Sequence, residues 1–77
     1  MNDASSLDRA REFLSDLMSD RDTSPLEIVP VIEAYAFRLG ESLRRHQDRE
    51  ISDRELDAHA IQIRLSYTQD LMKLLAA

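Results

Sequence analysis

Apolar residues recur at spacings of three and four along most of this chain, which is the period of an α-helix. The pattern predicts three helices, over residues 6–18, 25–47 and 53–76. Residues 19–23 and 48–51 are expected to be the polar connections between them. We therefore expect one all-α domain over residues 1–77, in which a short N-terminal helix packs on a long antiparallel helical hairpin to form a three-helix bundle.

Two helix starts carry the spacing of a capping box, in which each of two side chains bonds the backbone N–H of the other residue. Ser24 and Glu27 have this spacing, and so do Ser52 and Glu55. Pro30 lies inside the second predicted helix, where its ring and its missing N–H disturb helical geometry. We expect a short opening turn, a kink near Pro30 and a regular helix beyond it.

The third predicted helix is apolar on two opposite sides. The side expected to face the second helix carries Leu56, Ala60, Ile63, Tyr67, Leu71 and Leu74. The other side carries Ile61, Leu65, Met72 and Leu75. A helix that is apolar on two sides needs two surfaces to pack against. The first helix can supply the second surface, and so can another chain, because exposed apolar patches mark interaction sites.

Phe37 gives a second reason to expect an intermolecular contact. It lies roughly opposite Tyr35 around the second helix, among charged residues. Together with the second apolar side of the third helix, it predicts a protein interface. A homodimer that completes a four-helix core between two hairpins is the expected arrangement.

Charge and composition argue against several functions. The chain has a net charge of −5, whereas binding to nucleic acid or to anionic membranes generally requires an excess of Lys and Arg. No apolar run approaches the roughly 20 residues of a membrane span. The first three residues, Met-Asn-Asp, lack the basic and apolar regions of a signal peptide. We expect a cytoplasmic protein, in a host cytoplasm if a phage encodes it.

The residue types give little chemistry to work with. Cysteine is absent, so disulfides and thiolate zinc sites are excluded. His46 and His59 each have an acidic residue four positions away, but two ligands are too few for a metal site. His59 is expected to be an exposed helical side chain. Serine and threonine fall mostly at predicted caps and on exposed faces, so we expect no catalytic, metal or cofactor site.

Charged residues form two clusters that could contact a partner. Basic residues surround the tip of the predicted hairpin, namely Arg38, Arg44, Arg45, Arg49 and Arg54. They form ion pairs on a solvated surface, contact phosphate, or bind an acidic patch on a protein. Acidic residues of the N-terminal half, Asp16, Asp20 and Asp22, could mimic nucleic acid on a basic partner.

These features favour a small non-enzymatic regulator, adaptor or inhibitor of bacterial or phage type, which binds another protein through its helical surfaces. One alternative is a nucleic-acid-associated regulator that uses the Arg-rich tip. Another is a structural subunit that assembles with itself.

Overall fold

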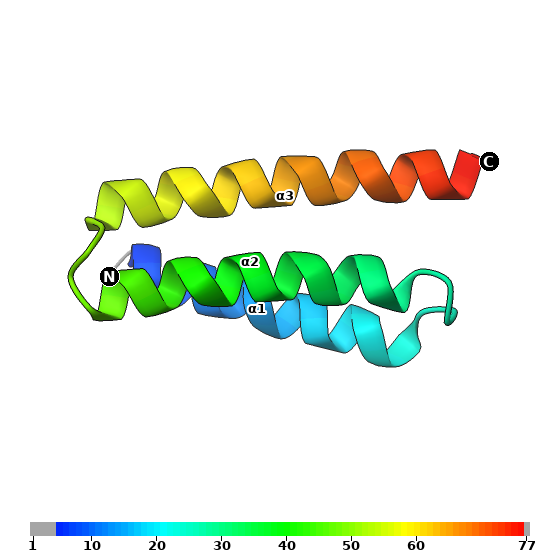
Figure 1. Ribbon diagram of the computed structural model, residues 1–77, viewed down its shortest axis with the longest axis horizontal. Coiled ribbons are helices and arrows are strands. Elements are labelled where there is room, and N and C mark those ends of the chain that lie inside the picture. Colours follow the sequence, from blue (N-terminus) through cyan, green and yellow to red (C-terminus); the bar gives the residue numbers. More distant parts are fainter. Residues whose placement is uncertain (1–4, 77) are drawn as a thin grey trace.

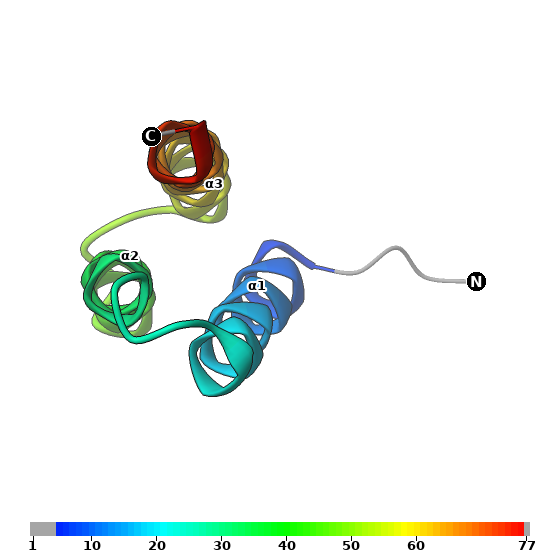
Figure 2. The ribbon, with the colours of Figure 1, turned by 90° about the vertical axis from the view of Figure 1, so that its right-hand side faces the viewer.

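A computed structural model describes residues 5–76 and contains three helices, α1 (Ser6–Thr23), α2 (Val29–Gln47) and α3 (Asp53–Ala76). Successive helices run in opposite directions, and α2 and α3 lie side by side and antiparallel (Figure 1). Seen end on, they occupy the corners of a triangle, with α1 inclined to the other two (Figure 2). Each helix packs against both of the others. The predicted all-α three-helix bundle is confirmed.

Side-chain caps begin α1 and α3. Ser5 caps α1, because its hydroxyl accepts a hydrogen bond from the backbone N–H of Asp8 at 3.1 Å. The predicted capping box at α3 is confirmed: the Ser52 N–H donates to Glu55 Oε1 at 3.0 Å, and the Glu55 N–H donates to Ser52 Oγ at 3.1 Å. Both caps satisfy N–H groups that no helical carbonyl reaches.

The predicted capping box at Ser24 and Glu27 does not open a helix. The carbonyl of Pro25 accepts the N–H groups of Ile28 and Val29, which makes a separate turn, and α2 begins only at Val29. Pro30 is therefore in the first turn of α2, where a missing N–H costs nothing. The expected opening turn followed by a regular helix is present, but the helix starts later than residue 25.

The first helix is five residues longer than predicted and includes the expected connection 19–23. The hydroxyl of Thr23 bonds back to the carbonyls of Ser19 and Asp20, at 3.2 and 3.4 Å. Arg21 lies in the last turn, where a positive charge suits the helix dipole, and its guanidinium pairs with Glu33 of α2 at 3.0 Å. Local polar contacts thus extend a helix whose apolar pattern has ended.

The core lies between the three helices and follows the predicted apolar stripes. Its buried members are Ala10, Phe13, Leu17, Ile32, Tyr35, Leu39, Ile51, Leu56, Ile63 and Tyr67. Burial of each large side chain contributes about 1.5–3 kcal/mol. Leu74 of α3, which was predicted to face α2, is more exposed than the rest of its stripe. The end of α3 extends past the first turn of α2 (Figure 1), and Leu74, near that end, is only partly covered.

Among residues 5–76, no helix is long and apolar enough to cross a membrane.

Candidate protein-interaction site

The second apolar side of α3 is exposed. Its four predicted interface residues, Ile61, Leu65, Met72 and Leu75, have 53–74% of their surface in contact with solvent. We call these four residues the α3 stripe. Leucine, isoleucine and methionine are usually buried, so four such side chains on one exposed helix face are unusual for a monomer.

The first helix packs on α3 without covering the stripe. Arg9 of α1 forms an ion pair with Asp57 at 2.7 Å, and the guanidinium of Arg64 lies 4.2 Å from the ring centre of Phe13. Asp57 and Arg64 mark one boundary between the inner side of α3 and the α3 stripe. Contact with α1 stops at this boundary, so α1 is not the second packing surface that the sequence left open.

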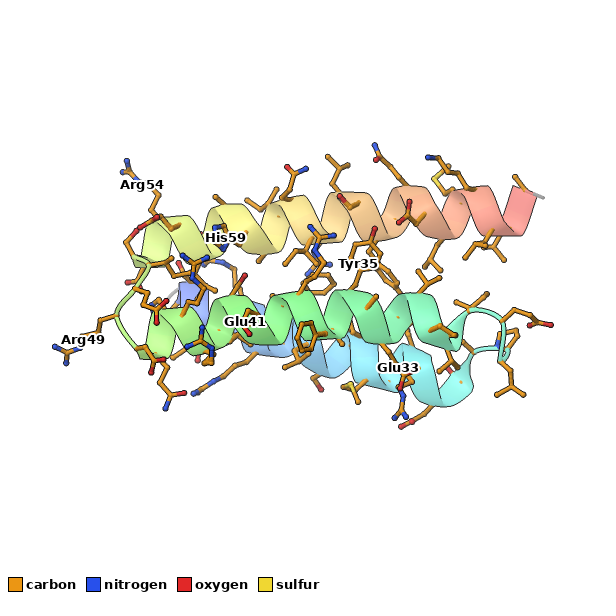
Figure 3. The ribbon with its side chains drawn as sticks, in the orientation of Figure 1. Glu33, Tyr35, Glu41, Arg49, Arg54 and His59 are labelled. Atoms are coloured by element: carbon orange, nitrogen blue, oxygen red, sulfur yellow. The ribbon has the colours of Figure 1, made fainter. Side chains whose placement is uncertain are left out.

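Two tyrosines hold the inner side of α3 in place. Their rings pack 5.6 Å apart at 57°. The hydroxyl of Tyr35 on α2 donates to Asp70, and the hydroxyl of Tyr67 donates to Asp20 of α1 at 3.1 Å. Tyr35 lies between α2 and α3 (Figure 3). These two bonds fix the rotation of α3 about its own axis, and thereby keep the stripe on the outside.

The same contacts shift the pKa values of both phenols. The hydrogen bond to Asp70, reinforced by burial, raises the pKa of Tyr35 above its ordinary value. Burial, reinforced by the bond to Asp20, raises the pKa of Tyr67 to about 12. Both shifts favour the neutral phenol, which can donate to a carboxylate whereas a phenolate cannot.

Phe37 is exposed as predicted, but it lies apart from the stripe. It belongs to α2 and lines a hollow of about 340 Å³ between α2 and α3, together with Arg38, Ser42, His59 and others. The sequence grouped Phe37 with the stripe in one interface. None of the four stripe residues lines the hollow beside Phe37.

The floor of this hollow holds a polar pair that the sequence did not indicate. Ser42 is buried in α2, and its Oγ lies 3.1 Å from Nδ1 of His59 on α3. His59 is therefore half-buried and hydrogen-bonded, not freely exposed as predicted. A histidine can act as the base that activates a serine nucleophile. A catalytic arrangement also needs a third group that orients the imidazole. The pair links α2 to α3, and within residues 5–76 the other ring nitrogen of His59 has no hydrogen bond.

The basic residues at the hairpin tip are mostly engaged. Arg44 forms ion pairs with Glu41 at 2.5 Å and with Asp48 at 2.8 Å, and these partners raise its pKa. Arg45 pairs with Glu50 at 3.4 Å. The predicted ion pairs on a solvated surface are thus observed for these two arginines.

The other basic residues differ in their surroundings. The guanidinium of Arg38 lies 5.2 Å from the ring centre of Tyr35. Arg49 has a left-handed backbone, φ 61°, at the turn between α2 and α3. Arg49 and Arg54 point away from the bundle (Figure 3), and the described part of the chain provides neither with an acidic partner. The imidazole of His46 lies 2.5 Å from Asp53, not against Glu50.

The acidic cluster is only partly available. Asp16 and Asp20 line a shallow hollow between α1 and α3, and Asp20 accepts the hydroxyl of Tyr67. Asp22 is exposed near the end of α1 and is outside that hollow. Because Asp20 has a structural role, the three residues do not form one continuous anionic patch.

Among residues 5–76, no three His, Cys, Asp or Glu side chains are grouped so that they could hold a metal ion. Comparison with known protein families, with curated proteins and with solved structures finds no match for this chain.

Proposed function

We propose that this protein is a small non-enzymatic regulator, adaptor or inhibitor of bacterial or phage type that acts by binding protein through its helical surfaces. The exposure of the α3 stripe carries this proposal. Four large apolar side chains on one helix face gain free energy only when another chain removes them from water. Phe37 and the hollow beside it offer a second surface of the same kind.

A comparison of three baits tests the proposal. Immobilised wild-type protein, Leu65→Asp and Phe37→Asp are exposed to a bacterial lysate, and retained proteins are identified by mass spectrometry. Each substitution places a charge on one apolar surface and leaves the core intact. We expect a protein that wild type retains and one variant loses, and that binds again when purified. Identical sets of retained proteins on all three baits would contradict the proposal.

A nucleic-acid-associated role is a second candidate, because Arg49 and Arg54 point outward at the tip (Figure 3). Its test is an electrophoretic mobility shift with random duplex DNA at about 50 mM salt, a condition that favours electrostatic binding. The expected shift would be lost in Arg49→Ala/Arg54→Ala. An unshifted duplex at tens of micromolar protein would eliminate this role. The net charge of −5 makes protein binding the better supported candidate.

A further inference from the structure

The spacing of exposed residues along α3 describes the helix that covers the stripe. The outward residues are Ala58, Ile61, Leu65, Thr68, Met72 and Leu75, and all six are exposed. Their successive spacings of three, four, three, four and three are those of a coiled-coil seam. Residues at such spacing pack against a helix that runs within about 20° of parallel or antiparallel. The α3 stripe is therefore shaped to receive one long helix.

Thr68 is the one polar residue in this seam, and its hydroxyl is already satisfied. Its Oγ1 donates to the carbonyl of Arg64, one turn earlier in the same helix, at 2.9 Å. A buried polar group is costly only when it lacks a hydrogen-bond partner. Covering the seam therefore leaves no hydroxyl unpaired, and the methyl group of Thr68 is available for packing.

We infer that the helix covering this seam is α3 of a second copy of the chain, running antiparallel. This inference rests on the proposed use of the α3 stripe as an interaction surface and names its occupant. The reason is that the seam residues fit the same residues of a second copy when the second helix runs in the opposite direction. An axis between residues 66 and 67 makes three kinds of layer, in which Ala58 meets Leu75, Ile61 meets Met72, and Leu65 meets Thr68 of the other copy.

Side-chain size selects this direction. In the antiparallel register, each small residue, Ala58 or Thr68, faces a leucine of the other copy. Alternation of large and small residues fills the space between helices evenly. A parallel pair would set Ala58 against Ala58 and Thr68 against Thr68, and would leave two thin layers in the seam. Two-fold symmetry permits both directions, so the alternation of side-chain size decides between them.

The charges beside the seam are compatible with self-association. No charged residue interrupts it between Ala58 and Leu75, and the side next to α2 is flanked by the neutral Gln62 and Gln69. On the other side, α1 already engages Asp57 and Arg64. Like charges therefore do not face each other along the seam.

Charge complementarity appears at the two ends. The register places Arg54, which points away from the bundle (Figure 3), just past Ala76 at the end of the other α3. Carbonyl groups at the end of a helix favour a nearby cation. This contact gives the outward guanidinium of Arg54 a partner that residues 5–76 of its own chain do not supply.

The seam is long but narrow, which sets the strength of the dimer. From Ala58 to Leu75 it extends about 26 Å at 1.5 Å per residue. One pair of helices over this length covers less than the roughly 800 Å² per partner of a standard interface. We therefore expect a reversible dimer that dissociates in the micromolar range.

The first experiment measures association by sedimentation equilibrium of the full chain from about 1 µM to 1 mM. Wild type is expected to pass from monomer to dimer, and Leu65→Asp to raise the dissociation constant at least tenfold. Phe37→Asp is the matched control, because it places the same charge on an exposed apolar residue outside the seam. Wild type that is monomeric throughout, or two variants that associate equally, would overturn the inference.

The second experiment tests direction by oxidation of single-cysteine variants, since the chain has no cysteine of its own. When Ile61→Cys and Met72→Cys are mixed, the antiparallel register predicts the mixed disulfide. A parallel pair would give only the two homodimers and would overturn the register. Ala34→Cys, on the exposed face of α2, is the control that measures how much disulfide cross-linking arises from random collision.

The two proposals fail in different ways. Monomeric wild type, together with a partner that Leu65→Asp fails to retain, would overturn self-association and leave protein binding in place. A dimer that depends on Leu65, together with identical proteins on all three baits, would contradict binding to a different protein and leave self-association in place.

Discussion

Gly40 lies in the interior of α2, where glycine lowers helix stability and the structure does not require it. Glycine at an internal helix position is about 0.8–1.0 kcal/mol less favourable than alanine. Its backbone has no positive φ, and a Cβ built on it meets nothing within 4 Å. Neither conformation nor space therefore requires glycine here. We expect Gly40→Ala to stabilise the protein by close to the full propensity difference.

The size of the effect is measurable. For a chain of 60–100 residues, 1 kcal/mol corresponds to a change of about 4–8 °C in Tm. Thermal and urea unfolding followed by far-ultraviolet circular dichroism gives both values. Ala34→Gly is the matched control, because Ala34 is an exposed residue of the same helix and should lose what Gly40→Ala gains. The double variant should return close to the wild-type Tm, since the two sites do not share a contact.

A neutral or destabilising Gly40→Ala, with the control behaving as expected, would refute this reasoning. It would mean that α1 approaches α2 more closely than the structure shows, because only a neighbouring group could cancel the gain. Gly40 lines a broad hollow of about 1050 Å³ between α1 and α2, together with Leu7, Leu14 and Leu43. The unfolding measurement therefore also tests whether this hollow is open in solution.

Three further predictions concern the cap, the tyrosines and the core. Ser52→Ala should lose about 1 kcal/mol of unfolding free energy in urea, because it removes the N-cap of α3. Tyr67 has a pKa raised to about 12, so its contribution to stability is complete below pH 10 and is lost as the pH rises from about 10 to 12. Tyr67→Phe also removes the bond to Asp20, so it should lower the urea midpoint at pH 8 and flatten the decline of that midpoint between pH 10 and 12. An equally steep decline in both proteins would contradict the assignment of this pH dependence to Tyr67. Leu39→Ala should lower the free energy of unfolding by about 2–5 kcal/mol because Leu39 is fully buried, whereas Leu65→Ala should change it by less than about 0.5 kcal/mol. Similar losses at both sites would contradict the division between core and stripe.

The sequence predicted the helices well where one signal dominates. The apolar period identified all three helices, and the capping box at Ser52 gave the start of α3 at the correct residue. The prediction of helix boundaries was wrong where two sequence signals compete. Ser24 and Glu27 have the spacing of a capping box, but Pro25 begins a separate turn, so the helix starts after it. Residues 19–23 look like a loop by composition, but contacts to α2 and α3 keep them helical.

The candidate site was predictable in its apolar part and hardly at all in its polar part. Helical period alone placed the α3 stripe opposite the inner side of α3 and Phe37 opposite Tyr35, since both depend only on position around a helix, but it left open whether α1 covers the stripe. The pairing of Ser42 with His59 depends on how α2 and α3 are aligned lengthwise, which no local pattern encodes. The same is true of Tyr67 and Asp20, which are 47 residues apart in the chain.

The α3 stripe is a feature that the fold itself does not need. Leucine, methionine, lysine and glutamine have nearly equal helix propensities, so polar residues at these positions would form α3 about as well. The rotation of α3 is fixed by the inner tyrosines and by contacts with α1, none of which involves the stripe. Its exposed side chains add little to the stability of one chain, and they promote nonspecific association. The stability of a single chain therefore gives no reason for apolar residues at coiled-coil spacing on this face, whereas an intermolecular helix contact does.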